Sequence, residues 1–160
     1  MAIGAVLSET SLVIDTDILT DWRYQKPYVQ RAISDYITRA KRPPALTSLS
    51  VFEALFGFEN KAAKSGSLDD RTVQDRLKTE ELISFCPVLP FDQPAAAIAA
   101  YIFSRLSKSH RNKHWRDTFI AATALAHGHG IATRNRKDFQ LIAENLPASQ
   151  SLLRVVVWKT

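Results

Sequence analysis

Ser11-Leu12-Val13-Ile14-Asp15 is a short aliphatic and β-branched run that stops at an acidic residue. Its three consecutive apolar residues show no alternation with polar ones. This is typical of a strand covered on both faces, as in a parallel sheet. In open α/β sheets, ligands bind beyond the carboxyl ends of the strands. The run therefore predicts an α/β fold and makes Asp15 a candidate site residue.

Further strands and helices alternate along the rest of the chain. Strands are expected at 11–14, 45–47, within 85–91, at 131–133 and at 153–157. Helices are expected at 28–41, 50–64, 71–83, 94–106 and 117–127, with a short one near Asp138. Such alternation predicts a mainly parallel central sheet of about five strands with helices on both faces. We expect one domain over residues 1–160, with residues 1–10 as an N-terminal extension.

Composition narrows the class of protein. The 160 residues are 46% hydrophobic and 23% charged, a balance typical of one folded domain. No apolar run approaches the roughly 20 residues of a membrane span, and the first ten residues do not resemble a signal peptide. Cys86 is the only cysteine, which fits a reducing compartment. We therefore expect a cytoplasmic protein that does not enter a membrane.

The net charge of +5 favours a polyanionic partner such as nucleic acid, although a basic surface that serves only solubility is an equal alternative. The basic residues form two bunches that border the acidic residues discussed next. The bunches are Lys108, Arg111, Lys113 and Arg116, and then Arg134, Arg136 and Lys137.

Three carboxylates are expected near strand ends, and each also has a structural interpretation. Asp15 follows the first strand, but Asp15 or Asp17 could instead be an N-cap of the next segment. Glu53 follows the second strand, yet Ser50-Val-Phe-Glu53 is also a capping box. Asp117 begins an expected helix, where acidic residues are electrostatically favoured. The strand at 131–133 delivers further polar groups, including Asn135, to the same edge of the sheet.

Clustered carboxylates repel one another and require a cation. Oxygen ligands select Mg²⁺ or Mn²⁺ over zinc, and such a metal can activate water against a phosphodiester. The sequence has no Cys/His cluster for zinc, and its 5 glycines form no phosphate-binding loop. His127-Gly-His129 is better explained as a helix C-terminus than as a pair of ligands.

Four motifs, in order, resemble those of the PIN-domain nucleases, and most of all the VapC-like toxins with their FitB-like relatives. They are Val13-Ile-Asp15-Thr, Ser50-Val-Phe-Glu53-Ala-Leu-Phe-Gly57, Asp117-Thr-Phe-Ile-Ala-Ala-Thr-Ala124 and Ala132-Thr-Arg-Asn135-Arg-Lys-Asp138-Phe139. A stretch at 90–97 strengthens the likeness, which extends from Leu12 to Trp158. Each motif alone is weak, but the four together are specific.

The resemblance implies a PIN-like three-layer fold and an Mg²⁺- or Mn²⁺-dependent endoribonuclease. It makes Asp15, Glu53 and Asp117 the metal ligands, with Asn135 or Asp138 as the fourth member of the catalytic site and Thr133 as a supporting hydroxyl. This sequence departs from the family by having Asp17 where Asn is common, and Asn135 where some relatives have Asp. We expect Arg116, Arg134 and Arg136 to contact the RNA.

The resemblance also implies that the chain is the toxin of a toxin–antitoxin pair, a homodimer, and a partner of a cognate antitoxin. The candidate dimer surfaces are 28–37 and 52–58, which are rich in apolar residues, although completion of the core is an equal explanation of those residues. Two alternative functions also agree with parts of the sequence. Asp15-Thr-Asp17 resembles the first motif of haloacid-dehalogenase phosphatases, with Asp15 as nucleophile. A catalytically silent partner-binding domain is the other, although the carboxylates argue against it.

Overall fold

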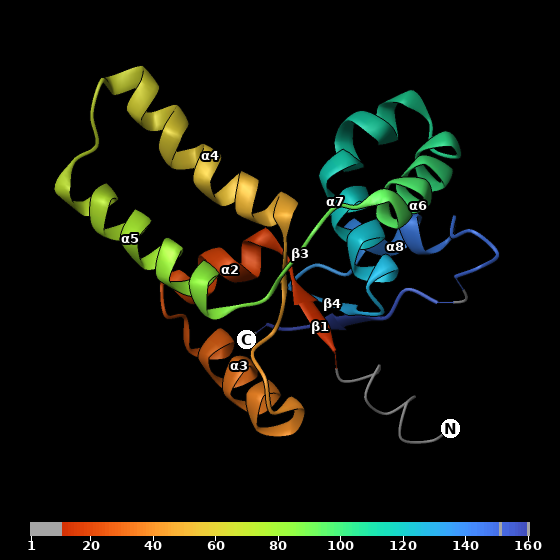
Figure 1. Cartoon of the computed structure of the whole chain (residues 1–160), viewed down its shortest axis with the longest axis horizontal. Coiled ribbons are helices and arrows are strands. Elements are labelled where there is room, and N and C mark those ends of the chain that lie inside the picture. Colours follow the sequence, from red (N-terminus) through yellow and green to blue (C-terminus); the bar gives the residue numbers. More distant parts are fainter. Residues whose placement is uncertain (1–10, 151, 160) are drawn as a thin grey trace.

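Five short strands, all paired in parallel, form the centre of the part of the chain that the structure describes (Figure 1). The structure is a computed structural model and describes residues 11–150 and 152–159, so the expected extension at 1–10 lies outside it. The strands are β1 Leu12–Ile14, β2 Leu46–Thr47, β3 Val88–Leu89, β4 Gly130–Thr133 and β5 Val155–Val157.

The strands follow the order β3-β2-β1-β4-β5. Strand β4 pairs with both β1 and β5, strand β2 pairs with β3, and a parallel bridge between Val13 and Ala45 joins the two sets. Strands β2 and β3 therefore lie on one side of β1, and strands β4 and β5 lie on the other. Strand order reverses between β1 and β4, which is where α/β proteins place their ligands. The expected parallel sheet is confirmed.

Seven helices surround these strands within the described residues. They are α2 Thr16–Arg23, α3 Pro27–Ala40, α4 Ser48–Ser65, α5 Asp70–Phe85, α6 Gln93–Ser104, α7 Lys108–Ala126 and α8 Lys137–Ala143. In Figure 1, α4 and α5 lie side by side and extend away from the sheet. No helix among these residues is long and apolar enough to cross a membrane.

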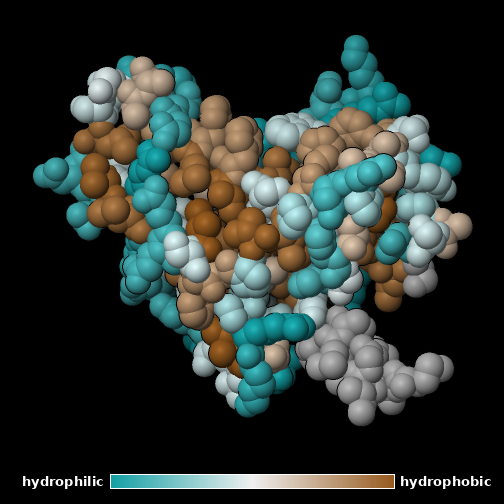
Figure 2. Space-filling view, in the orientation of Figure 1, coloured by the Kyte–Doolittle hydropathy of each residue, from teal (hydrophilic) through white to brown (hydrophobic). Residues whose placement is uncertain are grey.

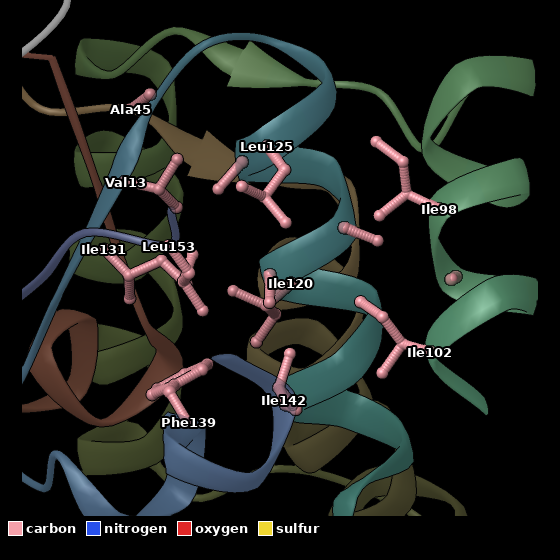
Figure 3. Packing of buried hydrophobic residues seen from close by; sticks show 14 of the residues in the cluster. Val13, Ala45, Ile98, Ile102, Ile120, Leu125, Ile131, Phe139, Ile142 and Leu153 are labelled. Atoms are coloured by element: carbon pink, nitrogen blue, oxygen red, sulfur yellow. The ribbon is translucent and has the colours of Figure 1, made fainter. Parts of the chain in front are cut away.

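Two hydrophobic clusters, one on each face of the sheet, make the fold three-layered. Val13 and Ile131 point into the cluster with α6, α7 and α8, where Ile120 and Phe139 are buried (Figure 3). The neighbouring strand residues Leu12, Ile14 and Ala132 belong to the other cluster, with α2 and α3. Both faces are apolar because successive strand side chains point to opposite sides of the sheet.

Two helices begin where the sequence pattern does not predict them. Helix α2 was not expected, because its apolar residues Ile18, Leu19 and Trp22 form only a short repeat before Pro27. Helix α7 begins at Lys108 rather than at Asp117, with Ser107 as its cap and a non-helical residue, His114, at an internal kink. The polar first half of α7 has no continuous apolar stripe, so the pattern marks only its second half.

The expected dimer surface at 28–37 is wrong in part, because α3 uses its apolar side chains in the core. Val29, Ile33 and Tyr36 are at most 5% exposed. They pack in the cluster that contains Leu12 and Trp158. What α3 presents to solvent is mostly polar.

Glycine is required at the start of β4. A Cβ atom at Gly130 would lie 2.9 Å from the carbonyl oxygen of Arg154 and 3.1 Å from Leu12 Cδ2. The absence of a side chain lets β4 fit between β1 and β5, and it thereby fixes the strand that carries Thr133.

Candidate metal centre

Asp15 lies at the carboxyl end of β1, beside the end of β4, and is only 7% exposed. Its carboxylate accepts a hydrogen bond from the backbone N–H of Ile18 at 3.0 Å and so caps α2. The Thr133 hydroxyl, at the end of β4, also hydrogen-bonds to it. The capping and site interpretations of Asp15 are therefore compatible: the cap holds the carboxylate at the point where strand order reverses.

Glu53 does not close a capping box. Thr47 is the N-cap of α4 and accepts from the Ser50 N–H at 3.2 Å, so Glu53 lies one turn further into the helix than that motif requires. Its carboxylate instead accepts a hydrogen bond from Thr16 Oγ1 at 2.9 Å and pairs with Arg116 Nε at 3.4 Å. Glu53 thus faces the residue that follows Asp15.

Asp117 lies in the first turn after the kink of α7 rather than at a helix N-terminus. The Thr118 hydroxyl donates to the His114 carbonyl oxygen at 2.8 Å, one turn back along the helix. His114 Nδ1 lies 3.4 Å from Asp117 Oδ2. Asp117 therefore lies just after the kink, in the wall of the cavity that Asp15 also lines. The imidazole ring beside its carboxylate belongs to His114, one turn earlier.

Asn135 and Asp138 have different positions. Asn135 is exposed; its side-chain oxygen accepts from the Lys137 N–H at 3.2 Å, and its Nδ2 donates to Asp138 Oδ1 at 3.0 Å. Asp138 lines the cavity described next, whereas Asn135 does not line it. The geometry therefore favours Asp138 over Asn135 as the fourth site member, with Asn135 orienting it.

These carboxylates line one cavity of about 190 Å³, which we call the acidic cavity. Its wall consists of Asp15, Thr16, Asp17, Glu53, Lys113, Arg116, Asp117, Ile120 and Asp138. The predicted trio of Asp15, Glu53 and Asp117 is thus brought together from three separate elements. Within residues 11–150 and 152–159, however, no three His, Cys, Asp or Glu side chains are already gathered tightly enough to hold a metal ion.

The electrostatics of the acidic cavity favour a cation. Burial, with added repulsion from Asp17 and Asp117, raises the pKa of Asp15 to about 7 against the pull of its two hydrogen bonds. Burial and the charges of Asp138, Glu53 and Asp17 likewise raise the pKa of Asp117 to about 7. The pKa of Glu53 is also raised, mainly by burial. Carboxylates that resist ionisation when unpartnered are stabilised by a bound cation.

The donor set fits Mg²⁺ or Mn²⁺, because it offers carboxylate and hydroxyl oxygens and no sulfur. Asp15, Glu53 and Asp117 are the side chains that could hold the ion, with Asp138 beside Asp117. Small side-chain rotations would have to bring them together, since the carboxylates line the cavity without converging on one point.

The basic residues expected to contact a polyanion divide into two groups. Arg116 and Lys113 line the acidic cavity, and Arg136 is exposed at the end of β4. Arg134 instead pairs with Asp21 at 2.9 Å and with Asp17 at 3.5 Å. Arg134 therefore has two carboxylate partners within the protein.

Sequence reasoning missed Thr16 and Asp21. Thr16 lies between two acidic residues in the sequence and holds the Glu53 carboxylate, but a lone threonine gives no signal of that contact. Asp21 is 2% exposed and buried in α2, which the pattern did not predict as a helix.

Comparison with known proteins shows which family this chain resembles. The model of a family described as PIN domain matches residues 12–145. The VapC ribonuclease Y4jK of Sinorhizobium fredii is 30% identical over 131 residues, which cover 81% of this chain and 90% of that protein.

Solved structures agree at the level of the fold. The DNA-bound VapBC of Salmonella typhimurium matches with a TM-score of 0.69 at 19% identity, covering 93% of this chain and 98% of that chain. FitAcB of Neisseria gonorrhoeae matches with a TM-score of 0.56 at 26% identity, covering 81% and 91%.

Proposed function

This chain belongs to the PIN-domain family and, within it, to the VapC-like group, and from that premise we propose that it is a metal-dependent endoribonuclease and the toxin of a toxin–antitoxin pair. The observation that carries the proposal is the acidic cavity, which five carboxylates line near the reversal of strand order: two from the start of α2 and one each from α4, α7 and α8. Family membership also favours this function over the haloacid-dehalogenase alternative, and the burial of the carboxylates disfavours a silent binding domain.

Asp15, Glu53 and Asp117 hold the metal in this proposal, and Asp138 is the fourth acidic member. When bound, Mg²⁺ or Mn²⁺ would polarise a phosphate oxygen and lower the pKa of a water molecule. The chain's own residues set the geometry: Thr133 and the Ile18 N–H orient Asp15, and Thr16 orients Glu53.

The basic residues at the rim receive the RNA backbone. Arg116 and Lys113 line the acidic cavity, so a phosphate group entering it would meet their positive charges. Arg136 is exposed beyond β4 and extends this basic rim. We retain Arg116 and Arg136 as RNA contacts, whereas the ion pairs of Arg134 suit it to another role. An RNA substrate agrees with the expected cytoplasmic location.

A test of the nuclease uses the full chain, purified without any antitoxin and stripped of metal with EDTA. It should not cleave a single-stranded RNA until Mn²⁺ or Mg²⁺ is added, and Asp15→Asn should remain inactive with metal. Asp35→Asn, an exposed change of the same kind on α3, should retain activity. Cleavage in EDTA that Asp15→Asn leaves intact would refute the proposal.

The antitoxin is proposed to bind across the acidic cavity and its neighbour. A second cavity of about 350 Å³ lies between α2, α4 and α5 and shares Thr16 and Glu53 with the first. Solved structures of similar fold include a toxin–antitoxin complex from Klebsiella pneumoniae and VapBC-5, a member of the VapBC family of toxin–antitoxin systems, from Mycobacterium tuberculosis. An extended tail in the second cavity could place a basic side chain against the carboxylates, where it would compete with the metal. The inhibiting peptide should therefore bind more tightly in EDTA than in millimolar Mg²⁺, and equal affinity would exclude this mode of inhibition.

A homodimer is proposed through the exposed aromatic residues of α4. Phe52 and Phe56 are each 52% exposed, and their rings stack at 5.6 Å. Figure 2 shows hydrophobic side chains gathered over α4 and α5 in this view. Contiguous exposed apolar side chains, such as this stacked pair, are a common feature of protein interfaces. Phe58, from the same predicted segment, is buried and belongs to the fold.

A further inference from the structure

Arg134 lies between two acidic residues of α2. Its Nη1 is 2.9 Å from Asp21 Oδ2, and its Nη2 is 3.5 Å from Asp17 Oδ2. The planar guanidinium can contact two carboxylates at once because its donors form a fixed fork. Arg134 directly follows Thr133, so this pair of contacts links the carboxyl end of β4 to α2 beside the acidic cavity.

Asp21 is a rigid anchor for the guanidinium. Its side chain is 3% exposed, Lys26 Nζ lies 2.7 Å from Oδ1, and the Tyr28 hydroxyl donates to Oδ2. Burial opposes ionisation of Asp21, but these hydrogen bonds and the charge of Arg134 hold its pKa below the ordinary value. Asp21 is therefore a charged partner that two neighbouring side chains hold in place. It binds Nη1 of Arg134, and Nη2 of the same guanidinium lies near Asp17.

Asp17 is the surplus carboxylate of the site. It lines the acidic cavity, and its charge contributes to the raised pKa values of Asp15, Glu53 and Asp117. It is also 56% exposed at its side chain, so without a partner it could rotate toward the other carboxylates. Among the described residues, Arg134 is the one cationic side chain within ion-pair distance of Asp17.

We propose that Arg134 is a positioning residue that holds Asp17 at the rim of the acidic cavity and out of the metal's coordination, with Asp21 as its anchor. The proposal rests on the metal-dependent function proposed above. It assigns Arg134 a role inside the protein in place of contact with RNA. The ion pairs of Arg134 then compensate for the additional negative charge that Asp17 brings to the site.

The direction of the change in metal affinity distinguishes this role from that of a purely structural ion pair. Arg134→Gln should free Asp17 to serve as an additional ligand, so Mn²⁺ should bind about tenfold more tightly, a size expected from one added negative charge near the ion. A merely structural role would loosen the site and weaken metal binding. Arg136→Gln removes the same charge two residues away from an exposed side chain, and it should change the affinity less than twofold.

The experiment titrates Mn²⁺ into the metal-free full chain without RNA, by isothermal calorimetry, for wild type, both glutamine variants, Asp17→Asn and the double variant at 17 and 134. Circular dichroism confirms the fold of each. In the Asp17→Asn background, Arg134→Gln should tighten binding by no more than about two- to threefold, since only its own charge remains to act.

The outcomes are distinct. Weaker or unchanged affinity in Arg134→Gln, or the same tightening with and without Asp17, would overturn the positioning role. Absence of Mn²⁺ binding by the wild type would instead overturn the proposed metal-dependent function. If Arg134→Gln does not fold, Arg134→Lys keeps the charge but cannot reach both carboxylates, and it should tighten binding only when Asp17 is present; affinity like that of the wild type would again overturn the role.

Discussion

Replacing Asp117 by Asn should stabilise the metal-free protein at neutral pH. Burial and neighbouring carboxylates raise the pKa of Asp117 from 3.8 to about 7. Between these two values the folded protein holds a proton that the unfolded chain has released. The free energy of unfolding therefore falls as pH rises from about 4 to 7, and the loss is complete above 7. Asn carries no charge, so it avoids this loss while keeping a similar shape.

The magnitude follows from the shift. About three pH units at roughly 1.4 kcal/mol each give a ceiling near 4 kcal/mol. Because the Asp117 side chain is 28% exposed, water screens part of the repulsion, and we expect roughly 1 to 2 kcal/mol. For a chain of this size, that corresponds to a rise in Tm of about 3 to 6 °C.

The assay is thermal unfolding followed by circular dichroism in EDTA, at pH 7.5 and pH 5. The gain of Asp117→Asn should be present at pH 7.5 and mostly lost at pH 5, where the wild-type carboxyl group is protonated. Asp35→Asn, which is exposed on α3, controls for the change in net charge. Adding Mn²⁺ at pH 7.5 should stabilise the wild type more than the variant. A variant that is less stable at pH 7.5, or equally stabilised at both pH values, would refute the reasoning.

Four further predictions address the site, the fold and the surface. Glu53→Gln should lower RNA cleavage at least about tenfold, because an amide replaces a charged ligand; full activity in a fluorogenic RNA assay would remove Glu53 from the site. Gly130→Ala should cost about 1–3 kcal/mol in a urea titration, since its Cβ would lie 2.9 Å from a backbone oxygen, whereas Gly57→Ala, with nothing within 4 Å, should not destabilise. Arg136→Gln should reduce the salt dependence of RNA binding by about one unit of slope. An unchanged slope would mean that Arg136 does not contact the RNA backbone. Phe56→Ser should shift the molecular mass in light scattering toward a monomer, and a dimer that persists at low micromolar concentration would place the interface elsewhere.

The layout of strands and most helices could be predicted because local patterns determine them. The apolar run before Asp15 marks the end of a strand, and the two consecutive prolines Pro43 and Pro44 interrupt a helix, whatever the tertiary contacts are. Gly66 likewise ends α4 with a positive φ of 78°, a conformation that glycine tolerates. Helix α2 and the first half of α7 were missed, since neither carries a long apolar stripe.

The candidate site was predictable in part, for a related reason. The position of Asp15 follows from the strand-end rule, and Glu53 follows the second strand, so their approach at one edge is expected of a parallel sheet. Asp117 lies inside α7, after the kink at His114, and its position does not follow from that rule. The contact of Arg134 with Asp21 joins residues 113 positions apart, and no periodicity signals it. The choice between Asn135 and Asp138 also depends on the direction of side chains in a short turn, which sequence alone does not specify.

The long helix α4 links the acidic cavity to the far end of the α4–α5 pair. Of its 18 residues, Glu53 is the sixth, so it lies about 9 Å along the axis from a base that Thr47 caps, whereas the tip lies about 27 Å away. Near that tip, Lys61 pairs with Asp69, and Glu59 pairs with Arg76 of α5. A small tilt of α4 about its base would therefore displace Glu53 by about one third as much as the tip. If a partner that binds only the outer end of the α4–α5 pair tilted α4, it would shift Glu53 relative to the other carboxylates by about one third of the displacement at the tip, without entering the cavity.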